Sequence, residues 1–209
     1  DVILEEAEED IQMMSGITPT DKPFLKTSVF EVFRTRIPWL LILMLSSTFT
    51  GIIISSFETA LEKLVVLTAF IPMIMGTGGN SGSQASVTVI RGLSLGEVDI
   101  KDVMKVLWKE LRVSILCGVV IAAATFLKVY FIDGFVMGTE NVSLVVSLVV
   151  ALTLCVTVIA AKLIGCVLPL LAKKMGFDPA VMASPFITTI VDAISLLIYF
   201  QVAVMLLNI

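Results

Sequence analysis

Five long apolar segments, separated by short charged connections, constrain this chain more than any other feature. They cover about residues 37–57, 64–90, 113–132, 142–172 and 179–209. Each is long enough to cross a hydrocarbon core of about 30 Å at about 1.5 Å per helical residue. The composition agrees, because 57% of the residues are hydrophobic and only 15% are charged, whereas soluble domains are about 25% charged. We therefore expect an all-α integral membrane protein with five transmembrane helices per subunit.

The basic residues predict how these segments are oriented. A cluster within residues 22–36, the connection 91–112 and the pair Lys173-Lys174 all fall on one side of a five-span arrangement. Loops rich in Lys and Arg stay in the cytoplasm, so we expect a cytoplasmic N-terminus and an external C-terminus. Residues 1–20 form an acidic helical end, which is either a solvated helix or a linker from a cytosolic domain. Residues 21–36 form a juxtamembrane segment, and residues 37–209 form the membrane domain.

The residue types that are scarce or absent exclude several functions. The chain has no histidine, which excludes Ser-His catalysis and His-ligated metals. Its three cysteines, Cys117, Cys155 and Cys166, lie inside apolar segments and are interpreted as packing residues. The net charge of −4 provides no basic domain for nucleic acid. We expect neither an enzyme nor a nucleic-acid-binding protein.

One charged residue stands in the last apolar segment. Asp192 is the only charged side chain in residues 179–209, and a carboxylate near the bilayer centre costs about 2.5–3.5 kcal/mol on insertion scales. Ser184, Thr188, Ser195 and Tyr199 lie on the same helical face at steps of three or four residues. Such a polar stripe predicts a pore-lining helix, and an intramembrane carboxylate is by default a functional site.

The second segment has an unusual glycine content. Four glycines stand within residues 76–82, in the run Gly76–Gln84 (GTGGNSGSQ). Because glycine disfavours helices, we expect this run to interrupt the second segment. Irregular backbone at membrane depth is tolerated only where it is buried in protein or lines a water-filled cavity. The interruption is therefore predicted to lie at a transport pathway.

The polar groups of the second and fifth segments are oxygen donors, which suit hard cations. They are Asp192, Asn80, Gln84, Ser184, Thr188 and the glycine carbonyls. One carboxylate is too little charge for a dehydrated divalent ion, and Mg²⁺ keeps several of its waters. A pore-forming homodimer would place two copies of Asp192 at its axis. We expect these groups to bind hydrated Mg²⁺ in such a pore.

Other interpretations of these residues remain open. Asp192 could pair with Lys162, the one charged residue within the fourth segment. Asn80 and Gln84 could instead hold helices together through hydrogen bonds. Glu110 and Asp178, predicted at the cytoplasmic ends, could form weak cation sites at a pore mouth or could simply be solvated. Asp178 could also cap the fifth segment.

Two sequence motifs resemble a known family. The runs 72–84 (PMIMGTGGNSGSQ) and 176–200 (GFDPAVMASPFITTIVDAISLLIYF) are similar to those in the membrane domain of the MgtE family of magnesium channels. The resemblance implies a homodimeric, magnesium-selective channel in a bacterial plasma membrane, with its pore lined by segments two and five. Mg²⁺ would be the transported ion and a possible regulatory ligand. Residues 1–20 resemble the end of the helix that follows the family's cytosolic magnesium-sensing region, which this chain lacks.

The resemblance also implies roles for single residues. Asp192 matches the central acidic selectivity residue, and Asn80 and the carbonyl of Gly76 match positions near the ion path. Thr188 lies one turn before Asp192, and Ser184 stands where some members carry Asn. The resemblance places Glu110 and Asp178 near the cytoplasmic mouth, and we expect Gln84 and Ser195 to line the pore.

Two other functional classes fit the same residues. A secondary divalent-cation transporter coupled to Na⁺ or H⁺ would also use interrupted helices and an intramembrane carboxylate. A membrane anchor that transports nothing would leave Asp192 without a role. We expect a magnesium channel, with the coupled transporter as the alternative.

Overall fold

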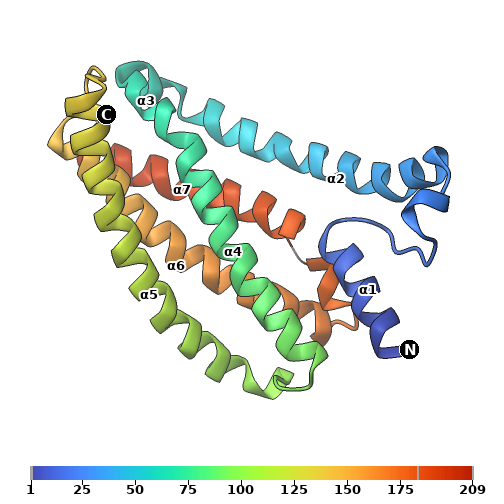
Figure 1. The fold of residues 1–209 in the computed structure, drawn as a ribbon. Helices are drawn as coiled ribbons and strands as arrows, with labels where there is room; N and C mark the ends of the chain where they lie inside the picture. The colour runs from blue at the N-terminus through green and yellow to red at the C-terminus, as the bar shows by residue number, and fades with distance from the viewer. Residues whose placement is uncertain (1, 183, 209) are drawn as a thin grey trace.

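The chain folds into a bundle of long helices. The computed structural model describes residues 2–182 and 184–208, with side chains described for residues 8–182 and 185–208, and this part contains no strand. Its α-helices are α1 (Val2–Met14), α2 (Val29–Ser56), α3 (Glu58–Lys63), α4 (Ile71–Ser94), α5 (Val103–Leu127), α6 (Leu144–Lys174) and α7 (Ser184–Leu207). Short helical turns occupy Phe24–Lys26, Val65–Phe70, Ile100–Asp102 and Pro179–Met182, and a π-helical stretch, Lys128–Val136, extends α5. α6 packs against both α4 and α5, α7 packs against α4 and α6, and α2 runs along α7 (Figure 1).

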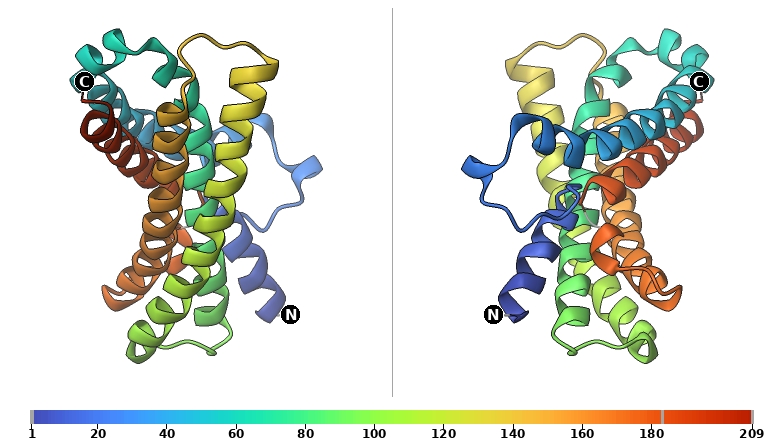
Figure 2. Two further views of the ribbon diagram at one scale, coloured as in Figure 1. Left: turned by 90° about the vertical axis from the view of Figure 1, so that its left-hand side faces the viewer. Right: turned by 90° about the vertical axis from the view of Figure 1, so that its right-hand side faces the viewer.

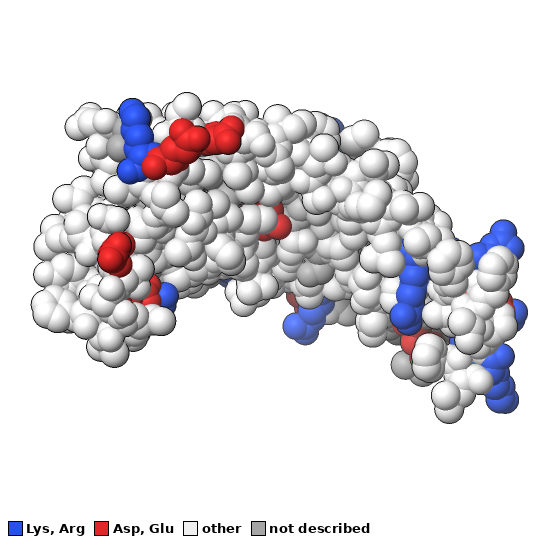
Figure 3. Space-filling view, turned by 90° about the horizontal axis from the view of Figure 1, so that it is seen from above, with Lys and Arg blue, Asp and Glu red and all other residues white. Residues whose placement is uncertain are grey.

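Four of the predicted spans are confirmed as helices long and apolar enough to cross a membrane. Within the described residues these are Val29–Ser56, Ile100–Val136, Leu144–Lys174 and Pro179–Leu207. On the face seen from above, most of the visible charged side chains lie toward the two ends of the molecule (Figure 3). The second predicted segment forms α4, whose Gly, Ser and Asn residues make it less apolar than the other four. The chain is therefore an all-helical membrane protein, and the count of five spans stays a prediction.

The interruption predicted at Gly76–Gln84 is wrong. α4 runs without a break from Ile71 to Ser94. Its glycines are held helical because α4 lies between α6 and α7, and tertiary packing routinely outweighs intrinsic helix propensity. The irregular backbone comes earlier, at Leu64 (φ −141°, ψ 78°) and the turn Val65–Phe70. Pro72 stands in the first turn of α4, where a missing N–H has no cost.

A large apolar cluster holds one end of the bundle together. Ile74 of α4, Leu154 of α6 and Leu196 of α7 are each at most 1% exposed. The buried Tyr199 hydroxyl donates a 2.9 Å hydrogen bond to the carbonyl oxygen of Leu67. This bond ties the end of α7 to the turn that precedes α4.

α2 stands apart from the rest of the bundle. None of its residues is buried, and its principal neighbour is α7. Ser28 caps its N-terminus by accepting a 3.2 Å hydrogen bond from the backbone N–H of Glu31. Both views in Figure 2 show the α1–α2 connection projecting from the side of the bundle. The segment that begins the first span therefore has an open surface.

Candidate functional site

Asp192 lies on α7 where this helix packs against α4. A Cβ atom added to Gly79 of α4 would lie 3.5 Å from the Asp192 Oδ1 atom and 3.1 Å from the Thr188 Cγ2 atom. Both side chains are half-buried, whereas Val191 beside them is 1% exposed. The missing side chain of Gly79 thus makes room for Thr188 and the carboxylate, one helical turn apart on α7.

The Asp192 carboxylate has no partner of its own within the described part of the chain. No hydrogen bond or ion pair there involves it. The Thr188 hydroxyl, one turn earlier, donates a 2.9 Å hydrogen bond to the carbonyl oxygen of Pro185, so that its oxygen can still accept or coordinate. The two residues form an acidic and oxygen-rich point in an otherwise apolar helix.

Lys162, the residue that could have neutralised Asp192, is paired elsewhere. Its Nζ atom lies 3.2 Å from Oε1 of Glu110, and the two side chains are 8% and 16% exposed. The alternative in which Lys162 pairs with Asp192 is therefore wrong, because the lysine points from α6 toward α5. Glu110, predicted as a metal-binding residue at the cytoplasmic mouth, already has a cationic partner.

Glycines pack the three central helices closely together. A Cβ atom on Gly78 would lie 2.5 Å from the Ser195 hydroxyl oxygen and 2.9 Å from the Thr157 methyl, and one on Gly82 would lie 2.9 Å from Ile187 Cγ2. A Cβ atom on Gly165 of α6 would collide with the Gly82 carbonyl group. Small residues four apart let membrane helices approach. The glycine run therefore serves helix packing, a role that the spacing of Gly78 and Gly82 could have indicated.

Gly76 lies on the open face of α4. It is exposed, and a Cβ atom there would meet nothing within 4 Å. In a continuous α-helix a carbonyl accepts the N–H four residues later. The Gly76 carbonyl therefore keeps only its second lone pair for a ligand, and it does not have the fully open backbone that the sequence predicted.

Asn80 and Gln84 continue this open face of α4. Both are exposed, and they line a groove of about 830 Å³ with Glu110, Lys162 and residues of α5. Asp192 approaches α4 at Gly79, one residue before Asn80. Gly76, Asn80 and Gln84 thus form an exposed face of α4. Asp192 of α7 approaches this helix at Gly79, and Glu110 of α5 and Lys162 of α6 line the groove along the face.

The remaining predicted site residues have different surroundings. Asp178 is exposed, and its Oδ1 atom accepts a 2.8 Å hydrogen bond from the N–H of Ala180. It therefore caps the short helical turn Pro179–Met182 rather than α7, which begins at Ser184. Ser195 is 1% exposed and its hydroxyl has no hydrogen-bond partner, so it lies in the packing around Gly78. The side chain of Ser184 lies outside the described residues.

The described residues contain no group of three or more Cys, Asp or Glu side chains that could enclose a metal ion. A lone carboxylate, with the Thr188 hydroxyl one turn away and the exposed Asn80 on the neighbouring helix, provides too little charge to strip a divalent cation of water. This donor set fits a cation that is recognised through its hydration shell.

Comparison with known proteins identifies relatives over the whole chain. The family MgtE, described as a divalent cation transporter, matches residues 71–202. The magnesium transporter MgtE of Thermus thermophilus is 34% identical over 208 residues, which cover 100% of this chain and 44% of that protein. The magnesium transporter MgtE of Bacillus subtilis is 35% identical over 203 residues, covering 97% of this chain and 43% of that protein. The corresponding protein of Enterococcus faecalis is 32% identical over 208 residues, 100% of this chain and 44% of its own length. The chain thus spans less than half the length of these relatives.

Proposed function

The chain belongs to the MgtE family of divalent cation transporters, and from this premise we propose that it is the pore domain of a magnesium-selective channel. In this proposal Mg²⁺ moves across the membrane along the exposed face of α4, past Asp192. The transported ion is the substrate, and no chemical step is involved.

The observation that supports this function best is the unpaired carboxylate of Asp192. It is half-buried in an apolar helix, and its one candidate counter-ion, Lys162, is held by Glu110 at 3.2 Å. A charge kept in a membrane segment without a partner is costly. A passing cation would stabilise it, which explains why a carboxylate is present at this position.

The polar groups around Asp192 suit a hydrated ion. Mg²⁺ gives up its inner waters reluctantly, and Asn80, the Thr188 hydroxyl and the Gly76 carbonyl can accept hydrogen bonds from those waters. Gln84 lies one turn further along the same exposed face of α4, whereas Ser195 is buried in the packing around Gly78. Asp178, which is exposed, would attract cations to the cytoplasmic mouth. Glu110 would contribute less there, because the ammonium of Lys162 offsets its charge.

A homodimer would complete the site. Two-fold symmetry brings the same face of both subunits together, and the exposed face of α4 beside Asp192 is the surface that supplies the proposed donors. Two Asp192 carboxylates would then provide about two negative charges for one divalent ion. We propose that the axis of the dimer is the ion path, with each α4 and α7 lining one half.

Current recordings test the channel directly. The full-length protein is reconstituted in planar bilayers with Mg²⁺ gradients and without gradients of Na⁺ or H⁺. A channel gives a current that reverses at the Mg²⁺ equilibrium potential. The absence of current, combined with Mg²⁺ uptake that requires a Na⁺ or H⁺ gradient, would establish the coupled transporter instead.

A further inference from the structure

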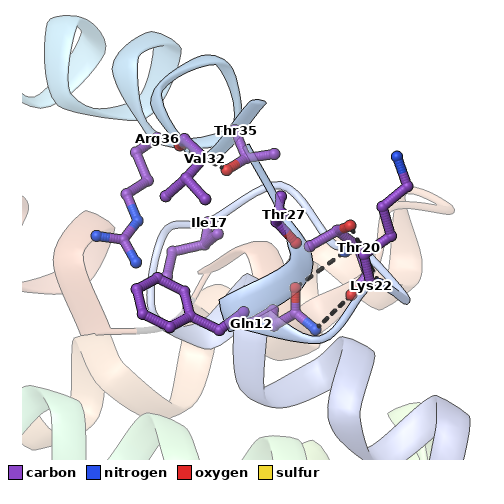
Figure 4. Close-up of a pocket in the computed structure, with 9 residues that line it drawn as sticks. Gln12, Ile17, Thr20, Lys22, Thr27, Val32, Thr35 and Arg36 are labelled. Atoms are coloured by element: carbon purple, nitrogen blue, oxygen red, sulfur yellow. Dashed lines mark hydrogen bonds between the residues drawn. The ribbon is translucent and has the colours of Figure 1, made fainter. Parts of the chain in front are cut away.

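A pocket lies where the α1–α2 connection folds back on the start of α2. It has a volume of about 280 Å³, and its lining includes Thr20, Lys22, Phe24, Thr27, Thr35 and Arg36 (Figure 4). We propose that this pocket binds the phosphate headgroup of an anionic membrane phospholipid. The inference concerns a lipid, so it does not depend on which ion the protein transports.

The pocket is built by hydrogen bonds within the chain. The side-chain amide of Gln12 donates to the carbonyl oxygen of Thr20 at 3.2 Å and accepts from its N–H at 2.9 Å (Figure 4). The N–H of Thr18 donates to the carbonyl oxygen of Thr35 on α2 at 3.0 Å. These bonds fix the connection against both α1 and α2, so the pocket is formed before a ligand arrives.

The charged side chains that line the pocket, Lys22 and Arg36, are both basic. Residues 21–36 contain four Lys or Arg residues, one Asp and one Glu, so the balance around the pocket is positive. Figure 4 shows Arg36 and Lys22 on opposite sides of the pocket. Within the described residues Arg36 has no ion pair, and Lys22 is paired only with the exposed Glu31. Exposed pairs of this kind contribute little stability, so Lys22 can exchange its partner for a phosphate.

The pocket also lies at the correct depth for a lipid headgroup. α2 has 28 residues, about 42 Å at 1.5 Å per residue, and is therefore longer than a hydrocarbon core of about 30 Å. Its N-terminal turns can therefore reach the headgroup layer. There the side chains of Phe24, Leu25 and Val29 are 69%, 94% and 88% exposed.

These exposed apolar side chains favour a phospholipid over a free phosphate ion. Basic residues next to a membrane span attract anionic headgroups, and apolar side chains beside them enter the acyl region. A free anion would use Lys22 and Arg36 but would leave Phe24, Leu25 and Val29 in water. A lipid uses both parts of this surface.

Native mass spectrometry of the full-length protein tests the proposal. The protein is equilibrated with equal amounts of phosphatidylglycerol and phosphatidylcholine, and bound lipids are counted for the wild type and for Lys22→Gln, Arg36→Gln and Lys174→Gln. Lys174 is the matched control, an exposed basic residue at the end of another span. We expect preferential binding of phosphatidylglycerol, reduced about fivefold by each pocket substitution and unchanged by Lys174→Gln.

Several results would overturn the proposal. Equal retention of both lipids by the wild type would do so, as would full displacement of phosphatidylglycerol by millimolar inorganic phosphate, which would identify a free-anion site. A change of oligomeric state without a change in lipid binding would identify a subunit contact instead. Arg36→Lys distinguishes charge from folding. This variant should keep the preference for phosphatidylglycerol. Loss of that preference together with a lower melting temperature would show that Arg36 is structural.

Discussion

The Lys162 ammonium lies 3.2 Å from the Glu110 carboxylate, across the contact between α6 and α5. Both side chains are largely buried, at 8% and 16% exposure, so the pair is screened little by water. Its effect on the candidate site is indirect. Because this lysine is held beside α5, it does not neutralise the carboxylate of Asp192 on α7.

Asp192→Asn should impair magnesium transport without unfolding the protein. The Coulomb attraction between a divalent ion and one carboxylate about 5 Å away is about 1.7 kcal/mol even at the dielectric constant of water. Removing that charge should therefore reduce Mg²⁺ affinity by more than about tenfold. Uptake assays in proteoliposomes over a series of Mg²⁺ concentrations measure this loss of affinity as a rise in the concentration that gives half-maximal uptake.

The control for this variant is Glu62→Gln, which removes an exposed carboxylate between α2 and the turn before α4. It should leave the Mg²⁺ concentration dependence unchanged. Equal loss in both variants would mean that the total charge of the protein matters rather than the position of Asp192. An unchanged affinity in Asp192→Asn would contradict the role that we propose for it.

Gly165→Ala should destabilise the bundle because the added methyl group would collide with the Gly82 carbonyl group. Overpacking of this kind costs about 1–3 kcal/mol. Gly51→Ala is the matched control, since a Cβ atom on this α2 glycine meets nothing within 4 Å, and alanine is the better helix former. Thermal unfolding in detergent should show a lower melting temperature for Gly165→Ala only. Equal melting temperatures would mean that α4 and α6 can separate at no cost.

The sequence predicted the helices better than their contacts. The apolar segments and the polar stripe on α7 follow from composition and helical period, which are local properties. The partner of Lys162 could not be predicted, because a side chain of that length can reach either of two neighbouring helices. The glycines of α4 were misinterpreted because helix propensity describes an isolated helix, whereas Gly78 and Gly82 are held between α6 and α7. The helical periodicity of the sequence predicted that Ser195 and Tyr199 share a face of α7 with Asp192. Periodicity alone does not indicate which residues of that stripe are buried.

Tyr199→Phe tests this correction to the stripe. Tyr199 is fully buried and its hydroxyl donates to the Leu67 carbonyl oxygen at 2.9 Å, so its role is to hold α7 against the turn before α4. Losing this buried hydrogen bond should cost about 1 kcal/mol of stability. Mg²⁺ uptake by the folded fraction should match the wild type. A loss of Mg²⁺ uptake with unchanged stability would indicate instead that the Tyr199 hydroxyl acts in the ion path.

A double-mutant cycle on Lys162 and Glu110 should show strong coupling between them. Lys162→Met leaves the Glu110 carboxylate largely buried and without its partner. Glu110→Gln leaves the Lys162 ammonium buried and without a counter-charge. Removing one member of a buried pair costs about 3–5 kcal/mol, whereas replacing both is often nearly neutral. We therefore expect each single variant to be less stable than the double variant Lys162→Met/Glu110→Gln, as measured by chemical unfolding in detergent.

The same cycle on the exposed pair Lys105 and Asp102 should show almost no coupling, because water screens it. If the two cycles gave equal coupling, burial would not be what makes the Lys162–Glu110 pair strong. If Lys162→Met weakened Mg²⁺ uptake as much as Asp192→Asn does while keeping full stability, the lysine would act in the ion path rather than in the packing of α5 against α6.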